Sequence, residues 1–283
     1  MNETPSIGSL LLERASRQKR RIGLGLTAPT DEIVEGLQKA RSFCEPVLYG
    51  AAVPGFTSFA SADPADALLG DLERGAIDAA VRGQISAFPF RKRFDKMYGG
   101  TFRPTDMMIT VLEFPGNKTL IVSPPSNVTT GTLEEKIMLV DASIVFCRMA
   151  GLPVSIGVLA QCRQGDLPDF AGTELEQSYK VAEQVVERYK DRYTIKNYGI
   201  DFEKAFEDGV TILIEPNGTT GNQVIRTLYF LGVVRFYGGP YMGAKHIVVE
   251  TFRNAADFPD VLMMAGALCN SRVDGEKGKA LCS

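Results

Sequence analysis

Short apolar runs alternate with amphipathic segments along most of the chain. Runs such as Ile22–Leu26 and Leu152–Leu159 have the length of strands, and the segments after them repeat apolar residues at helical spacing. This alternation predicts an α/β fold with largely parallel strands. Met107–Phe114 and Lys118–Val122 flank Pro115-Gly116-Asn117, which predicts a hairpin and therefore mixed sheets.

Helix start and stop signals place the remaining elements. A capping residue followed by acidic residues or proline marks a helix start, and glycine marks an end. On these signals, helices begin after Thr30, Asp63, Thr132 and Thr173 and at about Asn222, and a last one runs from Phe258 to Cys269. The other strands are expected at Pro46–Tyr49, Ala76–Val81, Val210–Ile214 and His246–Glu250.

Composition excludes several classes of site. The 283 residues predict about two domains.

A net charge of -3 gives no global basic field for nucleic acid or anionic lipid. With a single histidine, His246, a three-histidine zinc site is impossible, and any Ser–His or Cys–His pair must use that residue. His246 lies in an apolar strand, so we expect it to be structural, and no metal site is predicted.

The cysteines and the apolar stretches bear on location. The five cysteines form no CxxC pair, and an odd, scattered set is typical of a reducing compartment. No apolar core of signal-peptide length precedes the basic cluster Arg17–Arg21, and stretches such as Pro259–Cys269 are too short to span a bilayer. We therefore expect a cytoplasmic protein with no membrane span.

Three segments after predicted strands carry candidate chemistry. In Glu215–Asn222 a buried strand enters a Gly-rich turn and a helix, whose amides favour an anion; a capped turn without a ligand is the alternative. Arg82–Arg93 contains four basic residues that could clamp phosphate or carboxylate, or could form a solvated helix face. Ser123–Asn127 is either a polar edge of the same kind or a rigid proline turn.

Taken in order, these pieces resemble the phosphate acetyl/butyryltransferase family from about Ile22 to Leu268. The matching stretches are Glu45-Pro-Val-Leu-Tyr-Gly50, Gly75-Ala-Ile-Asp-Ala-Ala-Val-Arg-Gly83, Ile214-Glu-Pro-Asn-Gly-Thr-Thr-Gly-Asn222 and Tyr237-Gly-Gly-Pro-Tyr-Met-Gly243. The resemblance implies an isocitrate/isopropylmalate-dehydrogenase-like fold with two α/β lobes around a cleft. It also implies a discontinuous first lobe, residues 1–104 with 243–283, and a second lobe of residues 105–242.

The resemblance also implies site residues. The family has a Ser-Arg pair after the last motif; here Phe252-Arg253 stand there, so the arginine is present, the serine is absent, and Thr251 is the nearest hydroxyl. The family's catalytic aspartate corresponds to Asp260, with Asp257 as runner-up. Arg253 and Asp260 are thus the expected catalytic residues. The expected ligand-binding residues are Ser86, Arg91, Asn217, Gly218, Thr219, Thr220 and Asn222.

Within the superfamily the sequence is most similar to methanogen proteins described as methyltransferase subunits. This implies a transferase, a component of a methyl-group transfer system, that binds an anionic or phosphorylated ligand in the interlobe cleft. Two alternatives remain open: a phosphate acyltransferase acting between phosphate and coenzyme A, and a regulatory or assembly subunit without turnover. The identity of the cofactor is left open between coenzyme A and another anionic cofactor. The partners implied are other methyltransferase subunits, including a corrinoid protein, and a second copy in a homodimer.

Overall fold

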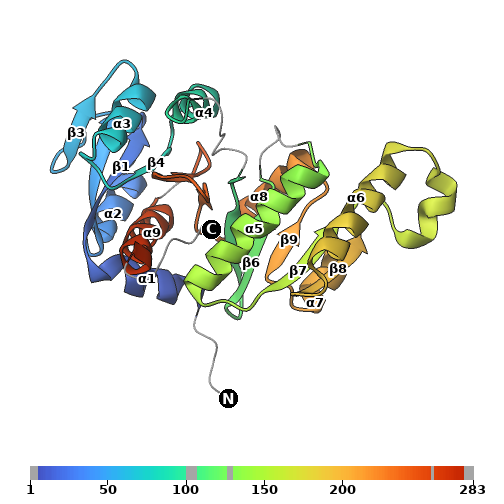
Figure 1. Ribbon diagram of the computed structural model, residues 1–283. Helices are drawn as coiled ribbons and strands as arrows, with labels where there is room; N and C mark the ends of the chain where they lie inside the picture. The colour runs from blue at the N-terminus through green and yellow to red at the C-terminus, as the bar shows by residue number, and fades with distance from the viewer. Residues whose placement is uncertain (1–5, 100–106, 126–129, 256–257, 277–283) are drawn as a thin grey trace. The chain divides into compact units, whose positions relative to one another are not determined.

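The computed structural model describes residues 6–99, 107–125, 130–255 and 258–276, with side chains placed as far as Ser271. The chain divides into two units, Met1–Thr105 with Phe236–Ser283 and Asp106–Arg235. Two six-stranded sheets form their frameworks (Figure 1). Their strands and helices show the α/β architecture and the mixed sheets that the sequence predicts.

The sheet of the first unit has the strand order β11-β12-β4-β1-β2-β3. Only β11 is antiparallel to its neighbour; the other pairs are parallel. The strands are β1 (Arg20–Leu26), β2 (Cys44–Gly50), β3 (Thr57–Ala60), β4 (Ala79–Val81), β11 (Gly239–Pro240) and β12 (Ile247–Glu250). The helices are α1 (Ile7–Arg17), α2 (Asp31–Ala40), α3 (Pro64–Glu73), α4 (Ala87–Lys96) and α9 (Pro259–Glu276).

Helix α9 is the core of the first unit. It is buried on all sides from Val261 to Asn270, as expected for a helix that is apolar all round. It packs on the sheet and on α1, whose residues Ile7, Leu11 and Ala15 form a buried stripe. The Asn270 amide group donates hydrogen bonds to three carbonyls at the end of α1. The two ends of the chain therefore stabilise one fold.

The sheet of the second unit has the order β10-β5-β6-β9-β7-β8. β5 and β6 are antiparallel, and β6, β9, β7 and β8 run parallel. The strands are β5 (Thr110–Phe114), β6 (Lys118–Ser123), β7 (Ser155–Leu159), β8 (Thr194–Gly199), β9 (Ile212–Ile214) and β10 (Arg235–Phe236). The helices are α5 (Leu133–Ala150), the 3-10 helix η2 (Gln164–Phe170), α6 (Glu174–Tyr189), α7 (Phe202–Glu207) and α8 (Gly218–Phe230).

Most local predictions are confirmed, and the exceptions have physical reasons. The hairpin β5–β6 forms, and Thr132 and Glu135 make a reciprocal capping box at α5. Helix α8 starts at Gly218, four residues earlier than expected, because Asn217 caps it. The prediction missed α1, β3, β8, α7, β10, β11 and the 3-10 helix in the polar loop after β7, and it gave α4 only as the alternative for Arg82–Arg93. β3, β8, α7, β10 and β11 have six residues or fewer, so they carry little periodic signal.

The strand ends of the first unit are packed too tightly for side chains at two glycines. A Cβ on Gly83 would lie 2.0 Å from the Gly25 carbonyl oxygen, and Gly83 has φ +59°. A Cβ on Gly25 would lie 2.4 Å from the Arg82 carbonyl oxygen. The segments after β1 and β4 therefore meet backbone to backbone, which only glycine allows.

We expect Gly83→Ala to lower the free energy of unfolding by more than about 2 kcal/mol, because it adds a backbone clash to the cost of a left-handed conformation. Gly75→Ala is the matched control. Gly75 has a similar φ of +72° but open space around its Cβ position, so only about 1 kcal/mol should be lost. Urea unfolding measures both, and equal losses would contradict the close approach.

Candidate functional site

The segments that follow three strands of the first sheet begin at the same edge, the carboxyl edge of the sheet. β12, β4 and β1 are parallel neighbours, so the segments after Glu250, Val81 and Leu26 start side by side. The Gln84 side chain joins two of them, because its Oε1 accepts from the amides of Thr27 and Ala28 at 2.9 and 2.7 Å. Open α/β sheets bind ligands at this carboxyl edge.

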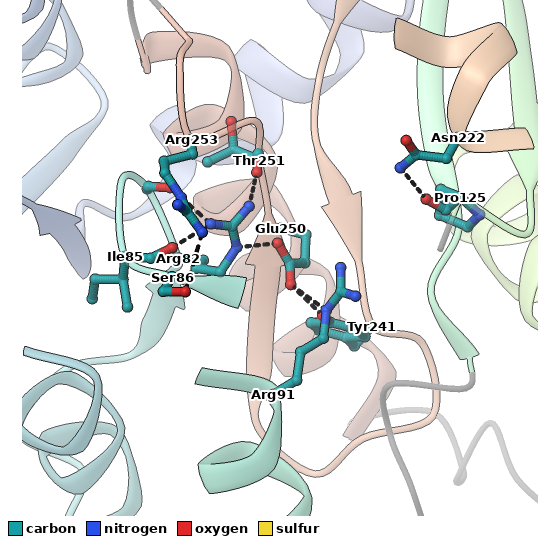
Figure 2. A network of polar contacts seen from close by, with 11 residues as sticks. Arg82, Ile85, Ser86, Arg91, Pro125, Asn222, Tyr241, Glu250, Thr251 and Arg253 are labelled. Atoms are coloured by element: carbon teal, nitrogen blue, oxygen red, sulfur yellow. Dashed lines mark hydrogen bonds and ion pairs between the residues drawn. The ribbon is translucent and has the colours of Figure 1, made fainter. Parts of the chain in front are cut away.

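Arg82 and Glu250 form a buried ion pair at the ends of β4 and β12 (Figure 2). Both residues are only 5% exposed. The rest of the Arg82 guanidinium donates to the carbonyls of Ile85 and Thr251, which lie in the segments after β4 and β12. One arginine thus fixes both segments, and the carboxylate neutralises its charge.

The second oxygen of Glu250 binds two more groups. Arg91 Nε on α4 donates to it at 2.8 Å, and the Tyr241 hydroxyl donates at 2.7 Å. Burial alone would raise the pKa of Glu250, but the charges of Arg82 and Arg91 and the hydrogen bonds from Tyr241 and Arg82 together hold the pKa below its ordinary value. Burial, and then the negative charge of Glu250, raise the pKa of Tyr241. Glu250 is therefore ionised and holds three side chains.

Arg253 and Ser86 are brought together at this edge. Arg253 Nη2 lies 3.1 Å from Ser86 Oγ, and both residues are exposed. Ser86 stands at the N-cap of α4, but its side chain makes no capping hydrogen bond there. A guanidinium, a hydroxyl and a helix N-terminus therefore adjoin one another, and each of the three favours an anion.

The other predicted residues of the first unit have different surroundings. Arg91 is paired with Glu250, and Arg93 is paired with Asp66 and Glu73. Asp260 lies in the first turn of α9, where a carboxylate also complements the helix dipole. Asp257 lies outside the described residues. Of the predicted basic clamp, three arginines, Arg82, Arg91 and Arg93, thus serve ion pairs within the protein.

The predicted turn of the second unit is a cap. Asn217 Oδ1 accepts from the amides of Thr219 and Thr220 at 3.0 and 3.1 Å. The Thr220 hydroxyl donates to the Asn217 carbonyl at 2.8 Å, and Gly218 is buried. The amides of Thr219 and Thr220, which were expected to bind an anion, therefore donate to Asn217. Anion binding at this turn stays a prediction.

The last residue of that set, Asn222, holds the segment after β6. Its Nδ2 donates to the Pro125 carbonyl at 2.8 Å (Figure 2). One residue earlier, a Cβ on Gly221 would lie 2.0 Å from the Pro124 carbonyl oxygen, so glycine lets the two segments touch. Asn222 thus positions backbone; the part of Ser123–Asn127 beyond Pro125 lies outside the described residues.

A buried acid and a buried lysine meet at the end of β9. Lys136 of α5 is 1% exposed and donates from Nζ to the Glu215 carbonyl at 2.6 Å. Within the described chain, Glu215 Oε1 and Ser123 Oγ are buried and have no hydrogen-bond partner. Burial lowers the pKa of Lys136 to about 8, although Glu215 opposes this. Burial raises the pKa of Glu215 to about 7, although Lys136 opposes this.

Sequence reasoning missed Glu250, Tyr241 and Lys136, although two of them gave a signal. Glu250 is a charge that ends an apolar strand, at the edge where sites form. Lys136 lies three and four residues before Leu139 and Val140, on the apolar face of its helix. A charge on a buried face needs a partner, but only the fold shows which one.

Neither a metal site nor a membrane-spanning helix is found in the described part of the chain. No three His, Cys, Asp or Glu side chains there gather as metal ligands would. No helix there combines the length and the apolar character that a membrane span requires.

We expect Glu250→Gln to lower the free energy of unfolding at pH 7 by about 3–5 kcal/mol, because Arg82 would stay buried without a counter-charge. The lowered pKa of Glu250 means that this contribution is present above its ordinary value of 4.5 and is lost as pH falls further. Asp66→Asn is the control. It breaks the exposed pair with Arg93 and should cost less than about 1 kcal/mol. Urea unfolding that finds equal losses would contradict the account.

The Lys136–Glu215 pair predicts an unusual pH profile. The raised pKa of Glu215 makes stability fall from about pH 4.5 to 7, and the lowered pKa of Lys136 makes it rise from about pH 8 to 10.5. We expect the difference in unfolding free energy between the wild type and the double variant Lys136→Met, Glu215→Gln to be lowest near pH 7.5, by up to about 3 kcal/mol relative to pH 5. Urea unfolding at pH 5, 7.5 and 10 measures it; a flat difference would contradict the pKa shifts that burial produces in the two groups.

Sequence comparisons show which known proteins this chain is similar to. No protein-family model matches the chain. The chain is 24% identical over 278 residues to a Methanosarcina mazei protein named "Putative methyltransferase mtx subunit X", covering 95% of this chain and 96% of that protein. It is 29% identical over 215 residues to a Methanopyrus kandleri protein described as an uncharacterized methyltransferase, covering 73% of this chain and 80% of that protein.

Solved structures show the same fold. A branched-chain phosphotransacylase from Enterococcus faecalis matches with a TM-score of 0.63 at 16% identity, covering 88% of this chain and 99% of its own. An isocitrate dehydrogenase from Methylococcus capsulatus matches with a TM-score of 0.51 at 12% identity, covering 90% and 86%. The fold predicted from the sequence resemblance is thus confirmed. The chain is similar over nearly its whole length to methanogen proteins named mtx subunit X, and its fold is that of the phosphotransacylases.

Proposed function

We propose that this protein is an anion-binding component of a methyl-group transfer system, built on a phosphotransacylase scaffold. The similarity to proteins named methyltransferase subunits supports the system. The pairing of Arg253 with Ser86 at the carboxyl edge of the first sheet is the observation that carries the anion site. A small phosphorylated or carboxylated molecule, or a cofactor such as coenzyme A, is the expected ligand.

The roles of Arg253, Ser86, Arg82 and Glu250 follow from their contacts, and that of Asp260 follows from the resemblance. Arg253 and Ser86 bind the anionic group, and Asp260 is the candidate base. Arg82 and Glu250 position the segments that carry Ser86 and Arg253, since Arg82 binds the carbonyls of Ile85 and Thr251 beside them. The resemblance further implies two lobes with a ligand cleft, a homodimer and a corrinoid partner, and these stay predictions.

One observation favours a binding or assembly role over acyl transfer. Phe252 stands where the resemblance implies a serine, and the Thr251 hydroxyl is buried. Acyl transfer is still tested directly by following acyl-coenzyme A formation from acetyl, propionyl and butyryl phosphates. An assembly role predicts a stable complex with methyltransferase subunits and no turnover.

A thermal-stability screen tests the anion site. We expect phosphate, coenzyme A or an acyl phosphate to raise the melting temperature, because a ligand at 100 times its Kd adds about 2.7 kcal/mol. Corrinoids and pterins of methanogenesis complete the screen. Arg253→Ala should weaken binding of the ligand found by about 10- to 100-fold, since a hydrogen bond to a charged group contributes about 1.5–3 kcal/mol.

Lys39→Ala is the charge-matched control. Lys39 is exposed in the last turn of α2, away from the carboxyl edge, so its loss should leave binding unchanged. Equal weakening by Arg253→Ala and Lys39→Ala would show a general charge effect and contradict the site. So would full affinity in Arg253→Ala.

A further inference from the structure

The second sheet has a topological switch point at β9. The chain runs from β6 through α5 to β7 and through α6 to β8, moving in one direction across the sheet. It returns through α7 to β9 and leaves through α8 in the opposite direction. The right-handed crossovers from β6 to β7 and from β7 to β8 then place α5 and α6 on one face, and Figure 1 shows α5 in front of the strands. Open α/β sheets bind ligands where neighbouring connections part in this way.

A hollow of about 630 Å³ lies at this point, within the second unit. Segments that follow three neighbouring parallel strands line it: Thr130 lies after β6, Gln161 after β7 and Asn217 after β9. Its volume is within the range of small-molecule sites, about 300–1,000 Å³. The fold therefore supplies both the position and the space for a ligand.

The lining of the hollow disfavours an anion. Glu134 and Glu174 bring carboxylates, and the residues lining the hollow include no lysine, arginine or histidine. The helix N-termini beside it are already capped, by Thr132 on α5, Thr173 on α6 and Asn217 on α8. Unlike the Arg253–Ser86 pair, this place has no unbalanced positive charge to offer.

The lining instead suits a flat, uncharged ring. Gln161, Gln177 and Gln184 each offer a donor and an acceptor on one amide, which match adjacent donor and acceptor atoms on a heterocycle edge. Leu133 and Val181 offer apolar surface to the faces of such a ring.

Two buried polar atoms mark the same strand ends. Ser123 Oγ ends β6 and Glu215 Oε1 follows β9, and neither has a hydrogen-bond partner in the described chain. A buried polar atom without a partner is costly, and such atoms collect at functional sites. Neither residue lines the hollow, so the two atoms mark the carboxyl ends of β6 and β9 and are not ligand contacts in the hollow itself.

We propose that this hollow is a binding site for an uncharged nitrogen heterocycle of the nucleobase type, separate from the anion site of the first unit. The glutamine amides read the ring edge, and Leu133 and Val181 cover its faces. Glu134 and Glu174 select against a phosphate group on the ligand.

Saturation-transfer NMR and calorimetry with the full chain test the site, with adenosine, guanosine and uridine as probes. At least one nucleoside should bind saturably, and its 5′-monophosphate should bind several-fold more weakly at low salt. Gln161→Ala with Gln177→Ala should weaken nucleoside binding by at least about fivefold, a typical loss for a hydrogen bond.

Two controls separate this site from other outcomes. Gln223→Ala removes an exposed amide of α8 that does not line the hollow, and Arg253→Ala disables the proposed anion site; both should leave nucleoside binding unchanged. Ribose tests for a polyol site and should not bind. The proposal is overturned if no nucleoside binds at millimolar concentration, if ribose binds as well as the nucleoside, or if Gln223→Ala weakens binding as much as the double variant.

Discussion

The carboxyl edge of the first unit depends on one buried charge, the Glu250 carboxylate. It neutralises Arg82 in the core and holds Arg91 and Tyr241 with its other oxygen. With its charge balanced, Arg82 can bind the carbonyls beside Ser86 and Arg253. Buried ion pairs add little stability by themselves, but losing one partner is costly. The pair therefore fixes where the segments lie more than it strengthens the fold.

The carboxyl edges of the two sheets each contain a buried basic side chain, but the charges that they present near the surface are opposite. In each unit a buried basic side chain binds backbone carbonyls at a strand end: Arg82, which is also paired with Glu250, in the first, and Lys136, which donates to the Glu215 carbonyl, in the second. Near the surface the first edge presents the guanidinium of Arg253, whereas the second presents amides and the carboxylates of Glu134 and Glu174. The electrostatics thus favour an anion at one edge and a neutral ring at the other.

The sequence predicted the fold better than the site. Capping residues and apolar periodicity are local signals, so the helix after Thr132 and the hairpin at Asn117 could be predicted. The partners of a side chain are set by the fold: Arg91 pairs with Glu250, 159 residues away, and its expected ligand contact stays a prediction. Asn217 caps its own helix, a contact that the sequence analysis did not assign to it, and anion binding there stays a prediction.

The most direct test of the anion site is an NMR titration with pyrophosphate that follows the arginine side-chain signals. The account predicts a saturable shift at Arg253, while the signals of Arg82 and Arg91 stay in place because Glu250 holds both groups. Shifts at Arg82 or Arg91 without one at Arg253, or no saturable shift at all, would contradict it.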